Sequence, residues 1–353
     1  MRYFVTGGSG FIGSNYIRHL LASDPAAAVT NYDKLTYAGS TLSLRDLEHE
    51  ERYRFVRGDI CDRRAVDAAI AGHDIVVNFA AESHVDRSIQ DGSEAVATNT
   101  FGVAVMAEAA RRAGVGRFVQ VGTDEEYGSI REGSFCESAP LAPASPYSAG
   151  KAGGSLVALA YARTHGLDVV VTRCTNNYGP WQFPEKVIPL FVTNLLDGAK
   201  VPLYGEGGNV RDWLHVDDHC RAIDVVLRSG ASGEVYNVGA SNECSNLELT
   251  RALLAALGAG EDRIERVRDR LGHDWRYSLD ATKLRALGWE PQHPFAEGLA
   301  QTVTWYRDNE WWWRPLKQAL LEARAAPQKP VPSASSSSGS TRGEEAVGSR
   351  TAS

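Results

Sequence analysis

The chain has 353 residues, of which 43% are hydrophobic and 23% are charged, as is usual for a globular protein with a large core. Its net charge is −7 and no basic patch stands out, which argues against nucleic acid as a partner. No apolar run reaches the roughly 18–20 residues of a membrane span and no signal-peptide pattern is present, so we expect neither a membrane partner nor secretion.

The chain opens with a predicted strand, a glycine turn and a helix. Apolar residues 3–5 are followed by TGGSGFIGS (residues 6–14), and apolar residues then recur at helical spacing. Gly10 would let the backbone approach a pyrophosphate, whose charge lies at the helix N-terminus. The alternative is a glycine-rich turn that packs the helix on the strand and binds nothing.

A second predicted strand, residues 28–32, ends at Asp33, which follows Gly13 by 20 residues. An acidic side chain at this place accepts hydrogen bonds from the adenosine ribose and repels a 2′-phosphate. Strand, turn, helix and acid together predict a site for NAD rather than NADP.

Further strands alternate with helices. Residues 53–56, 74–79, 117–121 and 168–172 are runs typical of a parallel sheet that is buried on both faces, and residues 93–113 form a predicted helix. This alternation predicts an α/β protein with a Rossmann-type, doubly wound parallel sheet.

Three acidic residues, Asp124, Glu125 and Glu126, follow the predicted strand that ends at residue 121. Neighbouring carboxylates repel and raise each other's pKa. A site that needs a proton donor beside an acceptor would use such a cluster, although a surface loop could carry it as well.

Tyr147 and Lys151 lie four residues apart, just after Pro146, which suits the first turn of a helix. The two side chains therefore share one helix face. An ammonium beside a phenol lowers the pKa of the phenol toward neutral, which gives a base that can take a proton from an alcohol as hydride leaves. The alternative is an ordinary pair on a helix surface.

Two features further along resemble binding sites. His215 and His219 flank two aspartates as in a metal site, but we expect Asp217 to cap a helix and predict no metal. Three consecutive tryptophans, residues 311–313, are expected to pack a terminal segment onto the core.

The five cysteines are scattered and form no CxxC pair, which is typical of reduced thiols in a cytoplasmic protein. Residues 325–353 offer almost nothing apolar to bury, so we expect them to form a disordered tail.

These motifs resemble those of the extended short-chain dehydrogenases that act on nucleotide sugars, and most closely those of the dTDP-glucose 4,6-dehydratase family. The resemblance covers roughly residues 1–315. The glycine turn and YxxxK belong to the whole superfamily, whereas TDE (residues 123–125) and DRLGHDWRY (residues 269–277) are much more specific. The other matching stretches are DKLTYAG, GDI, FAAESHVDRS, SPYSAGK, NNYGPWQFPEKVIPLF and LYGEGGNVRDWLHVDDH.

The resemblance implies an NAD-dependent lyase that acts as a homodimer on dTDP-glucose. The sugar would be oxidised at carbon 4, lose water across carbons 5 and 6, and take the hydride back at carbon 6, which yields dTDP-4-keto-6-deoxyglucose. In this reaction Asp124 is the implied acid and Glu125 the implied base, beside Thr123, Tyr147 and Lys151.

The resemblance also implies two sets of binding residues. The cofactor set is Gly7, Gly10, Phe11, Ile12, Gly13, Asp33, Lys34, Leu35, Thr36, Asp59, Ile60, Phe79, Ala80, Ala81, Ser83, Thr98, Tyr147, Lys151 and Asn177. The substrate set is Ser83, Thr123, Asn176, Glu185, Lys186, Val187, Pro202, Leu203, Tyr204, Arg211, Asn246, Asp269, Arg270 and His273.

We expect two interleaved domains. Residues 1–175 would form mainly the NAD-binding domain and residues 176–324 mainly a smaller nucleotide-sugar-binding domain, with a strand near residues 235–238 that returns to the main sheet. The cleft between them would lie at the carboxyl ends of the strands.

Three positions depart from the family pattern. Gly122 and Gly150 each replace a usual serine, and Glu126 replaces a usual valine. Gly122 is expected to loosen the strand end by about 0.5–1 kcal/mol. Glu126 is expected to point away from the substrate because successive strand side chains alternate between faces, and the choice of base becomes doubtful if it does not.

Two alternative functions share the fold. A UDP-sugar 4-epimerase or a UDP-glucuronate decarboxylase would use NAD and the Tyr-Lys pair but would need no acid to expel water, so Asp124 discriminates against them. A nucleotide-sensing regulator would have lost the chemistry, and the five intact catalytic residues argue against it.

Overall fold

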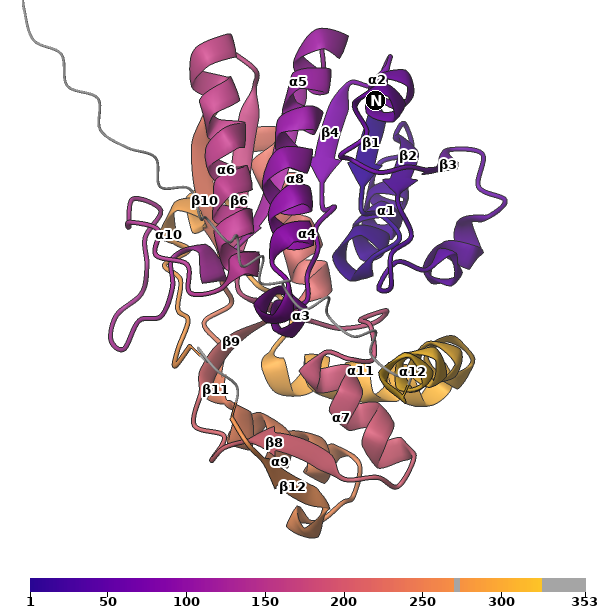
Figure 1. Cartoon of the computed structure of the whole chain (residues 1–353), viewed down its shortest axis with the longest axis vertical. Helices are drawn as coiled ribbons and strands as arrows, with labels where there is room; N and C mark the ends of the chain where they lie inside the picture. The colour runs from indigo at the N-terminus through magenta and orange to yellow at the C-terminus, as the bar shows by residue number, and fades with distance from the viewer. Residues whose placement is uncertain (270–273, 326–353) are drawn as a thin grey trace, which may run out of the picture.

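The computed structural model describes residues 1–269 and 274–325. Its central sheet has seven parallel strands in the order β10-β6-β5-β4-β1-β2-β3 (Figure 1). The strands are β1 (Arg2–Thr6), β2 (Ala28–Asp33), β3 (Tyr53–Arg57), β4 (Ile75–Asn78), β5 (Arg117–Thr123), β6 (Val169–Cys174) and β10 (Glu234–Val238). This confirms the predicted doubly wound α/β fold, including the late strand near residues 235–238 that pairs with β6.

Helices cover both faces of this sheet because its strands are apolar on both sides. Every residue of β4 and β6 is buried. The apolar sides of α1 (Phe11–Ser23) and α8 (Val216–Ser229) join the core on one face. On the other face, α2 (Arg63–Ile70), α5 (Val103–Ala113) and α6 (Pro146–His165) form a second core.

The predicted helix over residues 93–113 is confirmed, although it is not an α-helix throughout. It begins as α4 (Ser93–Val96), passes through a π-helical segment, η2 (Ala97–Gly102), and continues as α5. The Asn99 side chain bonds both the backbone N–H and the carbonyl oxygen of Glu82, at 2.9 and 3.0 Å. A π-turn commonly marks a functional site, and this one brings η2 against the segment that follows β4.

The remaining described elements pack around a third core below the sheet in Figure 1. Two small sheets, β11-β9-β7 and β12-β8, contribute to this part. The strands are β7 (Asn176–Tyr178), β8 (Val201–Tyr204), β9 (Val210–His215), β11 (Glu243–Ser245) and β12 (Ile264–Val267). The helices are α7 (Val187–Leu196), α9 (Asn246–Ala256), α11 (Phe295–Asp308) and α12 (Glu310–Ala325). The predicted domain division at residues 175 and 176 stays a prediction.

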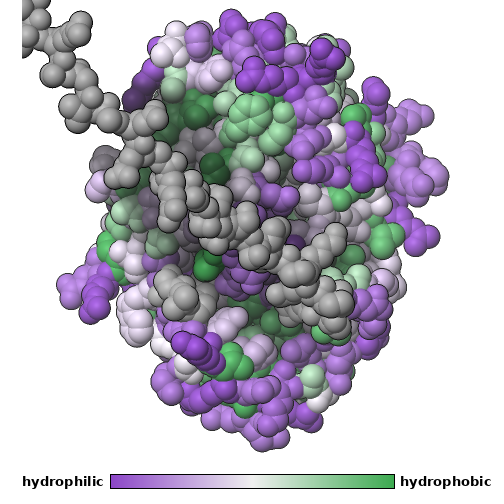
Figure 2. Space-filling view, in the orientation of Figure 1, coloured by the Kyte–Doolittle hydropathy of each residue, from purple (hydrophilic) through white to green (hydrophobic). Residues whose placement is uncertain are grey.

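Short elements complete the described chain. They are α3 (Val85–Gln90), α10 (Thr282–Arg285), η1 (Thr41–Leu47), η3 (Asp124–Glu126) and η4 (Glu261–Arg263). Hydrophilic side chains gather along the upper, right and lower margins of the face in Figure 2. None of the described helices is both long enough and apolar enough to span a membrane.

The tryptophan cluster packs as predicted for two of its three members. Trp312 and Trp313 are buried, and their indole N–H groups donate to Ser43 Oγ at 3.2 Å and to the Tyr306 carbonyl oxygen at 2.7 Å. Trp311 stays 46% exposed. The cluster therefore fastens α12 to the core. Ala325, the first residue of the predicted tail, is the last residue of α12, and residues 326–353 lie outside the described residues.

The predicted helix cap at Asp217 is wrong by two residues. His215 is the N-cap of α8, where its Nδ1 accepts the Asp217 N–H at 3.3 Å. His215, Asp217 and His293 bring one possible metal-ligand atom each within 4.8 Å. However, the two imidazole rings are stacked at 4.1 Å and 23°, so the in-plane lone pairs of their nitrogens run side by side rather than converge. We assign no metal to this cluster, and the predicted absence of a metal stays a prediction.

Candidate active site

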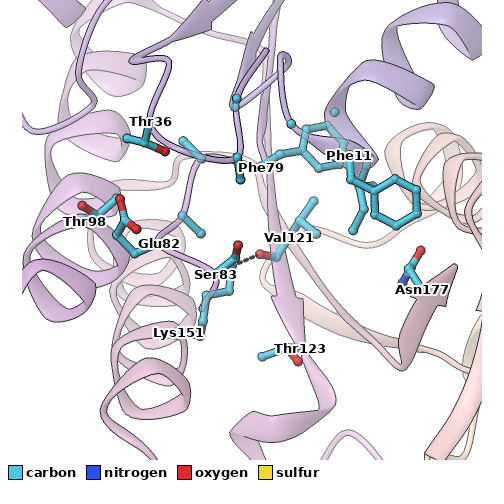
Figure 3. A pocket seen from close by; sticks show the side chains of 18 of the residues that line it. Phe11, Thr36, Phe79, Glu82, Ser83, Thr98, Val121, Thr123, Lys151 and Asn177 are labelled. Carbon is cyan, nitrogen blue, oxygen red and sulfur yellow. Dashed lines mark hydrogen bonds between the residues drawn. The ribbon is translucent and has the colours of Figure 1, made fainter. Parts of the chain in front are cut away.

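A cavity of about 320 Å³ lies at the carboxyl ends of the central strands. Segments that follow β1, β2, β3, β4, β5 and β6 all contribute to its lining. Figure 3 shows Phe11 and Asn177 on one side of this space, Thr98 and Glu82 on the other, and Lys151 and Thr123 beneath it. A crevice at this edge of a doubly wound sheet is where such folds bind ligands.

The glycine turn after β1 is packed too tightly for side chains. Gly7 has φ +68°, and a Cβ there would lie 2.6 Å from the Ala80 backbone nitrogen. Gly10 lines the cavity and is the N-cap of α1 without any side-chain cap, so the first N–H groups of the helix are available to a ligand. The turn therefore offers the backbone donors and the positive helix end that a pyrophosphate requires.

Asp33 ends β2 and is buried beside this turn. Its carboxylate accepts the backbone N–H groups of Ser9 at 2.9 Å and Leu35 at 2.7 Å. Burial raises the pKa of Asp33, and these two donors oppose that rise. The carboxylate is thus fixed at the cavity wall with acceptor capacity left for a ribose hydroxyl.

Nearly all predicted cofactor residues line this cavity. They are Gly7, Gly10, Phe11, Ile12, Gly13, Asp33, Lys34, Thr36, Asp59, Ile60, Phe79, Ala80, Ala81, Ser83, Thr98, Tyr147, Lys151 and Asn177. Leu35 is the exception: it is absent from the lining and contributes its N–H to Asp33 from a left-handed backbone, φ +57°.

The predicted substrate residues fall into two groups. Ser83, Thr123, Asn176 and Lys186 line the cavity, whereas Glu185, Val187, Pro202, Leu203, Tyr204, Arg211, Asn246 and Asp269 do not. Arg270 and His273 lie outside the described residues. Among those behind the lining, Glu185 is buried and its carboxylate lies 3.2 Å from His84 Nε2 and 3.4 Å from an Arg87 nitrogen.

Pro202, Leu203, Tyr204, Arg211 and Asn246 of the second group lie on β8, β9 and the start of α9. The Arg211 guanidinium donates to the Asp274 carbonyl oxygen at 3.0 Å and lies 4.4 Å from the Tyr277 ring centre. Asn246 donates its backbone N–H to Asn209 at 2.9 Å. Arg211 also lowers the pKa of Asp124, against larger opposing effects. Arg211 is therefore the member of the second group that acts electrostatically on the acidic cluster.

The predicted acid and base lie at the end of β5. Thr123 closes the strand, and its hydroxyl donates to Asp124 Oδ1 at 3.1 Å while accepting the Glu125 N–H at 3.3 Å. Asp124 is only 3% exposed, and its Oδ2 has no hydrogen-bond partner among the described residues. Burial, and then the charge of Glu125, raise the pKa of Asp124 well above its ordinary value.

Tyr147 and Lys151 reach the same cavity from α6. Lys151 is buried and donates to the Val121 carbonyl oxygen at 2.5 Å, as the dashed line in Figure 3 marks. Burial, and then Glu125, raise the pKa of Tyr147 well above its ordinary value. The pKa of Tyr147 is therefore shifted away from neutral in the chain by itself, opposite to the predicted direction, because burial and nearby carboxylates disfavour the phenolate.

Glu126 points away from the cavity, as predicted, but for another reason. Residues 124–126 form the 3₁₀ turn η3 rather than a continued strand, so strand alternation does not apply. The Glu126 carboxylate is fully buried and pairs with Arg173 Nε at 2.7 Å.

The sequence interpretation missed several lining residues. Glu82, Val85, Gln182 and Phe183 line the cavity and belong to the quoted stretches FAAESHVDRS and NNYGPWQFPEKVIPLF, so these motifs held the signal. Cys174 also lines the cavity and had a weaker signal, since it follows the predicted strand over residues 168–172.

Known proteins are similar to this chain in sequence and in fold. The model of the GDP-mannose 4,6 dehydratase family matches residues 4–302. The dTDP-glucose 4,6-dehydratase of Streptomyces niveus is 58% identical over 322 residues, which is 90% of this chain and 96% of that one. That of Streptomyces antibioticus is 55% identical over 334 residues, or 93% and 99% of the two chains.

Solved structures of nucleotide-sugar enzymes are also similar to this chain. The dTDP-glucose 4,6-dehydratase DesIV of Streptomyces venezuelae, crystallised with NAD, superposes with a TM-score of 0.88 at 56% identity and covers 90% of this chain and 100% of that chain. The UDP-glucose 4-epimerase of Thermus thermophilus, also with NAD, gives 0.81 at 32% identity and covers 88% and 100%. With its greater identity to the dehydratases and its acidic cluster at the cavity, the chain belongs to the dTDP-glucose 4,6-dehydratase family.

Proposed function

We propose that the protein converts dTDP-glucose into dTDP-4-keto-6-deoxyglucose and water, with NAD restored at the end of each turnover. The observation that carries this proposal is the buried Asp124, whose pKa is raised beside Glu125 at the wall of the cavity. Elimination of water needs a neutral acid next to a base, and an epimerase has no use for that pair.

The residues of the cavity fit NAD. Gly10 and the uncapped start of α1 would hold the pyrophosphate, and Asp33 would bind the adenosine ribose and exclude a 2′-phosphate. When bound, NAD accepts a hydride from carbon 4 of the sugar and returns it to carbon 6.

Tyr147 takes the proton of the 4-hydroxyl in the first half of the reaction. The raised pKa of Tyr147 opposes this step, so the phenolate needs positive charge nearby. Lys151 supplies such a charge from the next turn of α6, and its bond to Val121 fixes the direction of its side chain. Thr123 faces the same space and would hold the substrate hydroxyl.

Glu125 and Asp124 divide the elimination between them. The ketone at carbon 4 makes the hydrogen on carbon 5 acidic, and Glu125 removes that proton. Asp124 gives its proton to the 6-hydroxyl, so the carbon–oxygen bond breaks and water leaves. The proton on Glu125 exchanges with solvent before Glu125 returns a proton to carbon 5. Tyr147 has then gained one proton and Asp124 has lost one, so one proton passes from Tyr147 to Asp124 through water before the next turnover.

The remaining predicted residues would hold the nucleotide. Arg211 suits a diphosphate because a guanidinium donates two parallel hydrogen bonds, and Lys186 adds a positive charge at the cavity wall. Pro202, Leu203, Tyr204 and Asn246 would surround the base and its sugar. We infer that residues 176–324 mainly carry these contacts, and that residues 1–175 mainly carry the cofactor.

A direct test is to incubate the purified protein with dTDP-glucose and to weigh the product by mass spectrometry. The proposal predicts a product lighter by one water, without consumption of added NAD. A product of unchanged mass would mean a 4-epimerase, and no product from protein that retains NAD would mean a regulator. The proposal also implies that thymine is preferred over uracil in the substrate, and equal catalytic efficiency with UDP-glucose and dTDP-glucose would contradict this preference.

We further propose that the protein is a homodimer. Val96, Phe101 and Leu156 are 44–56% exposed although they are large and apolar, and they project from α4, η2 and α6, which pack together. Such a face on adjoining helices suits a second copy of the chain. Sedimentation should give a dimer, and Leu156→Glu should give a monomer; a monomeric wild type would contradict this.

We also propose that the protein works in the cytoplasm. All five cysteines lie within the described residues and none of them forms a disulfide, which suits a reducing compartment. Fractionation of the producing cells should find the protein with cytoplasmic markers, and recovery from another compartment would contradict this.

A further inference from the structure

A buried carboxylate lies directly behind the acid–base residues. Glu126 has no exposed surface and accepts hydrogen bonds from Arg173 Nε at 2.7 Å, from Ser155 Oγ at 2.8 Å and from the Thr123 backbone N–H at 3.3 Å. The donors belong to β6, α6 and β5, the three elements that carry the catalytic side of the cavity. A buried charge needs such donors, because an unpaired one is strongly destabilising.

Gly122 makes the room that this carboxylate occupies. A Cβ at position 122 would lie 2.5 Å from Glu126 Oε1, 2.7 Å from the Thr172 carbonyl oxygen and 3.2 Å from Ser155 Oγ. Gly122 does not have a positive φ, so the position requires glycine for its small size and not for its backbone conformation. The two unusual residues are therefore neighbours in space: the Glu126 carboxylate and the Thr172 carbonyl oxygen together occupy the place that a side chain at position 122 would take. This replaces the expectation that Gly122 merely loosens the strand end.

The pair acts on the residues that face the substrate. Glu126 holds the N–H of Thr123, and the hydroxyl of Thr123 in turn holds Asp124 and the start of the turn at Glu125. Ser155 lies one helical turn after Lys151 on α6. One carboxylate thus joins the turn that carries the acid and the base to the helix that carries Tyr147 and Lys151, without entering the cavity.

We propose that Glu126, with the space provided by Gly122, is a positioning residue that fixes Asp124 and Glu125 relative to Tyr147 and Lys151. The inference rests on the proposed dehydratase function. Small displacements of catalytic groups reduce rates strongly, whereas substrate contacts made elsewhere in the cavity are unaffected. The signature is therefore a fall in kcat that leaves substrate binding and bound cofactor unchanged.

The first test is Glu126→Gln, which keeps the shape of the side chain and removes its charge toward Arg173. We expect kcat to fall roughly tenfold while KM for dTDP-glucose and the content of NAD stay within about twofold. Elimination should slow more than oxidation, so NADH absorbance should build up during turnover. The matched control is Glu132→Gln, which removes an exposed carboxylate and should leave all these quantities unchanged.

The second test, Gly122→Ala, keeps every charge and places a methyl group against the Glu126 carboxylate and the Thr172 carbonyl oxygen. It should produce the same fall in kcat at constant KM and the same build-up of NADH, even if Glu126→Gln fails to fold. The inference is overturned if folded Gly122→Ala keeps at least half of the wild-type kcat, or if kcat, KM and NAD content deteriorate together. Wild type is measured alongside: if it releases no water from dTDP-glucose, the proposed function fails, whatever the variants do.

Discussion

The ammonium of Lys151 donates a hydrogen bond to the Val121 carbonyl oxygen across 2.5 Å. This bond ties α6 to the carboxyl end of β5, immediately before the residues Thr123, Asp124 and Glu125. Two segments that the sequence separates are thereby held at one cavity, where Tyr147 and Lys151 line the same space as Asp124 and Glu125.

Tyr147→Phe and Glu125→Gln should stop the reaction at different steps. Tyr147→Phe removes the base for the 4-hydroxyl, so it should suppress the first oxidation and leave no transient NADH absorbance. Glu125→Gln should still allow that oxidation but stop proton removal from carbon 5. Each should lower kcat by roughly 10²–10⁴-fold, measured by stopped-flow absorbance and product formation. Transient NADH in Tyr147→Phe, or full elimination in Glu125→Gln, would reverse these roles.

Asp124 should give the reaction a basic pH limb. Burial and Glu125 raise the pKa of Asp124, so the carboxyl stays protonated above its ordinary range and activity falls as pH rises through the raised value. Asp124→Asn should lower kcat by roughly 10²–10⁴-fold and remove this limb from the profile of kcat against pH. An unchanged limb in Asp124→Asn would assign it to another group.

Asp33→Ala should change the cofactor preference. The substitution removes the acceptor for the ribose and also releases the N–H groups of Ser9 and Leu35, which could then bind a 2′-phosphate. NAD affinity should fall by roughly tenfold or more and discrimination against NADP should narrow, measured by titration of protein stripped of its cofactor. Unchanged affinity for both would remove Asp33 from the ribose site.

His219 should make the fold sensitive to acid. It is fully buried, shares a 2.9 Å hydrogen bond with Asn177, and has its pKa lowered by burial from 6.5 to about 3. Below about pH 6.5, His219 therefore binds a proton in the unfolded chain but stays neutral in the folded chain. The stability that neutral His219 contributes is fully present above pH 6.5 and decreases as the pH falls toward 3.

His219→Gln keeps a donor for Asn177 but does not titrate. Between pH 6.5 and 5.5, the free energy of unfolding of wild type should drop relative to that of the variant by about 1 kcal/mol. Denaturant titrations at several pH values measure this difference. Parallel pH profiles of the two proteins would show that His219 is not the group responsible.

Much of the fold was predictable because its strands are locally apolar. The predicted strands over residues 28–32, 53–56 and 168–172 match β2, β3 and β6 to within two residues at each end. The π-turn inside the predicted helix over residues 93–113 was not predictable from local periodicity, and its residue Asn99 bonds Glu82 across the tertiary structure.

The candidate site was predictable in its residues more than in its electrostatics. The sequence placed Tyr147 beside Lys151 and therefore predicted a lowered phenol pKa, but the burial that raises it exists only in the folded chain. The ion pair of Glu126 was likewise not predictable, because its partner Arg173 lies 47 residues away in the sequence and no local pattern indicates their contact. The relation between Gly122 and Glu126 also became visible only in three dimensions.

In the proposed reaction one proton moves at carbon 5 while a hydride passes internally from carbon 4 to carbon 6. The most direct test is a single turnover of dTDP-glucose carrying deuterium at carbon 4, run in ordinary water and paired with unlabelled substrate in heavy water. The deuterium of the substrate should appear at carbon 6 of the product, and solvent deuterium should appear at carbon 5. Loss of the carbon 4 label to the solvent, or a product without solvent deuterium at carbon 5, would contradict it.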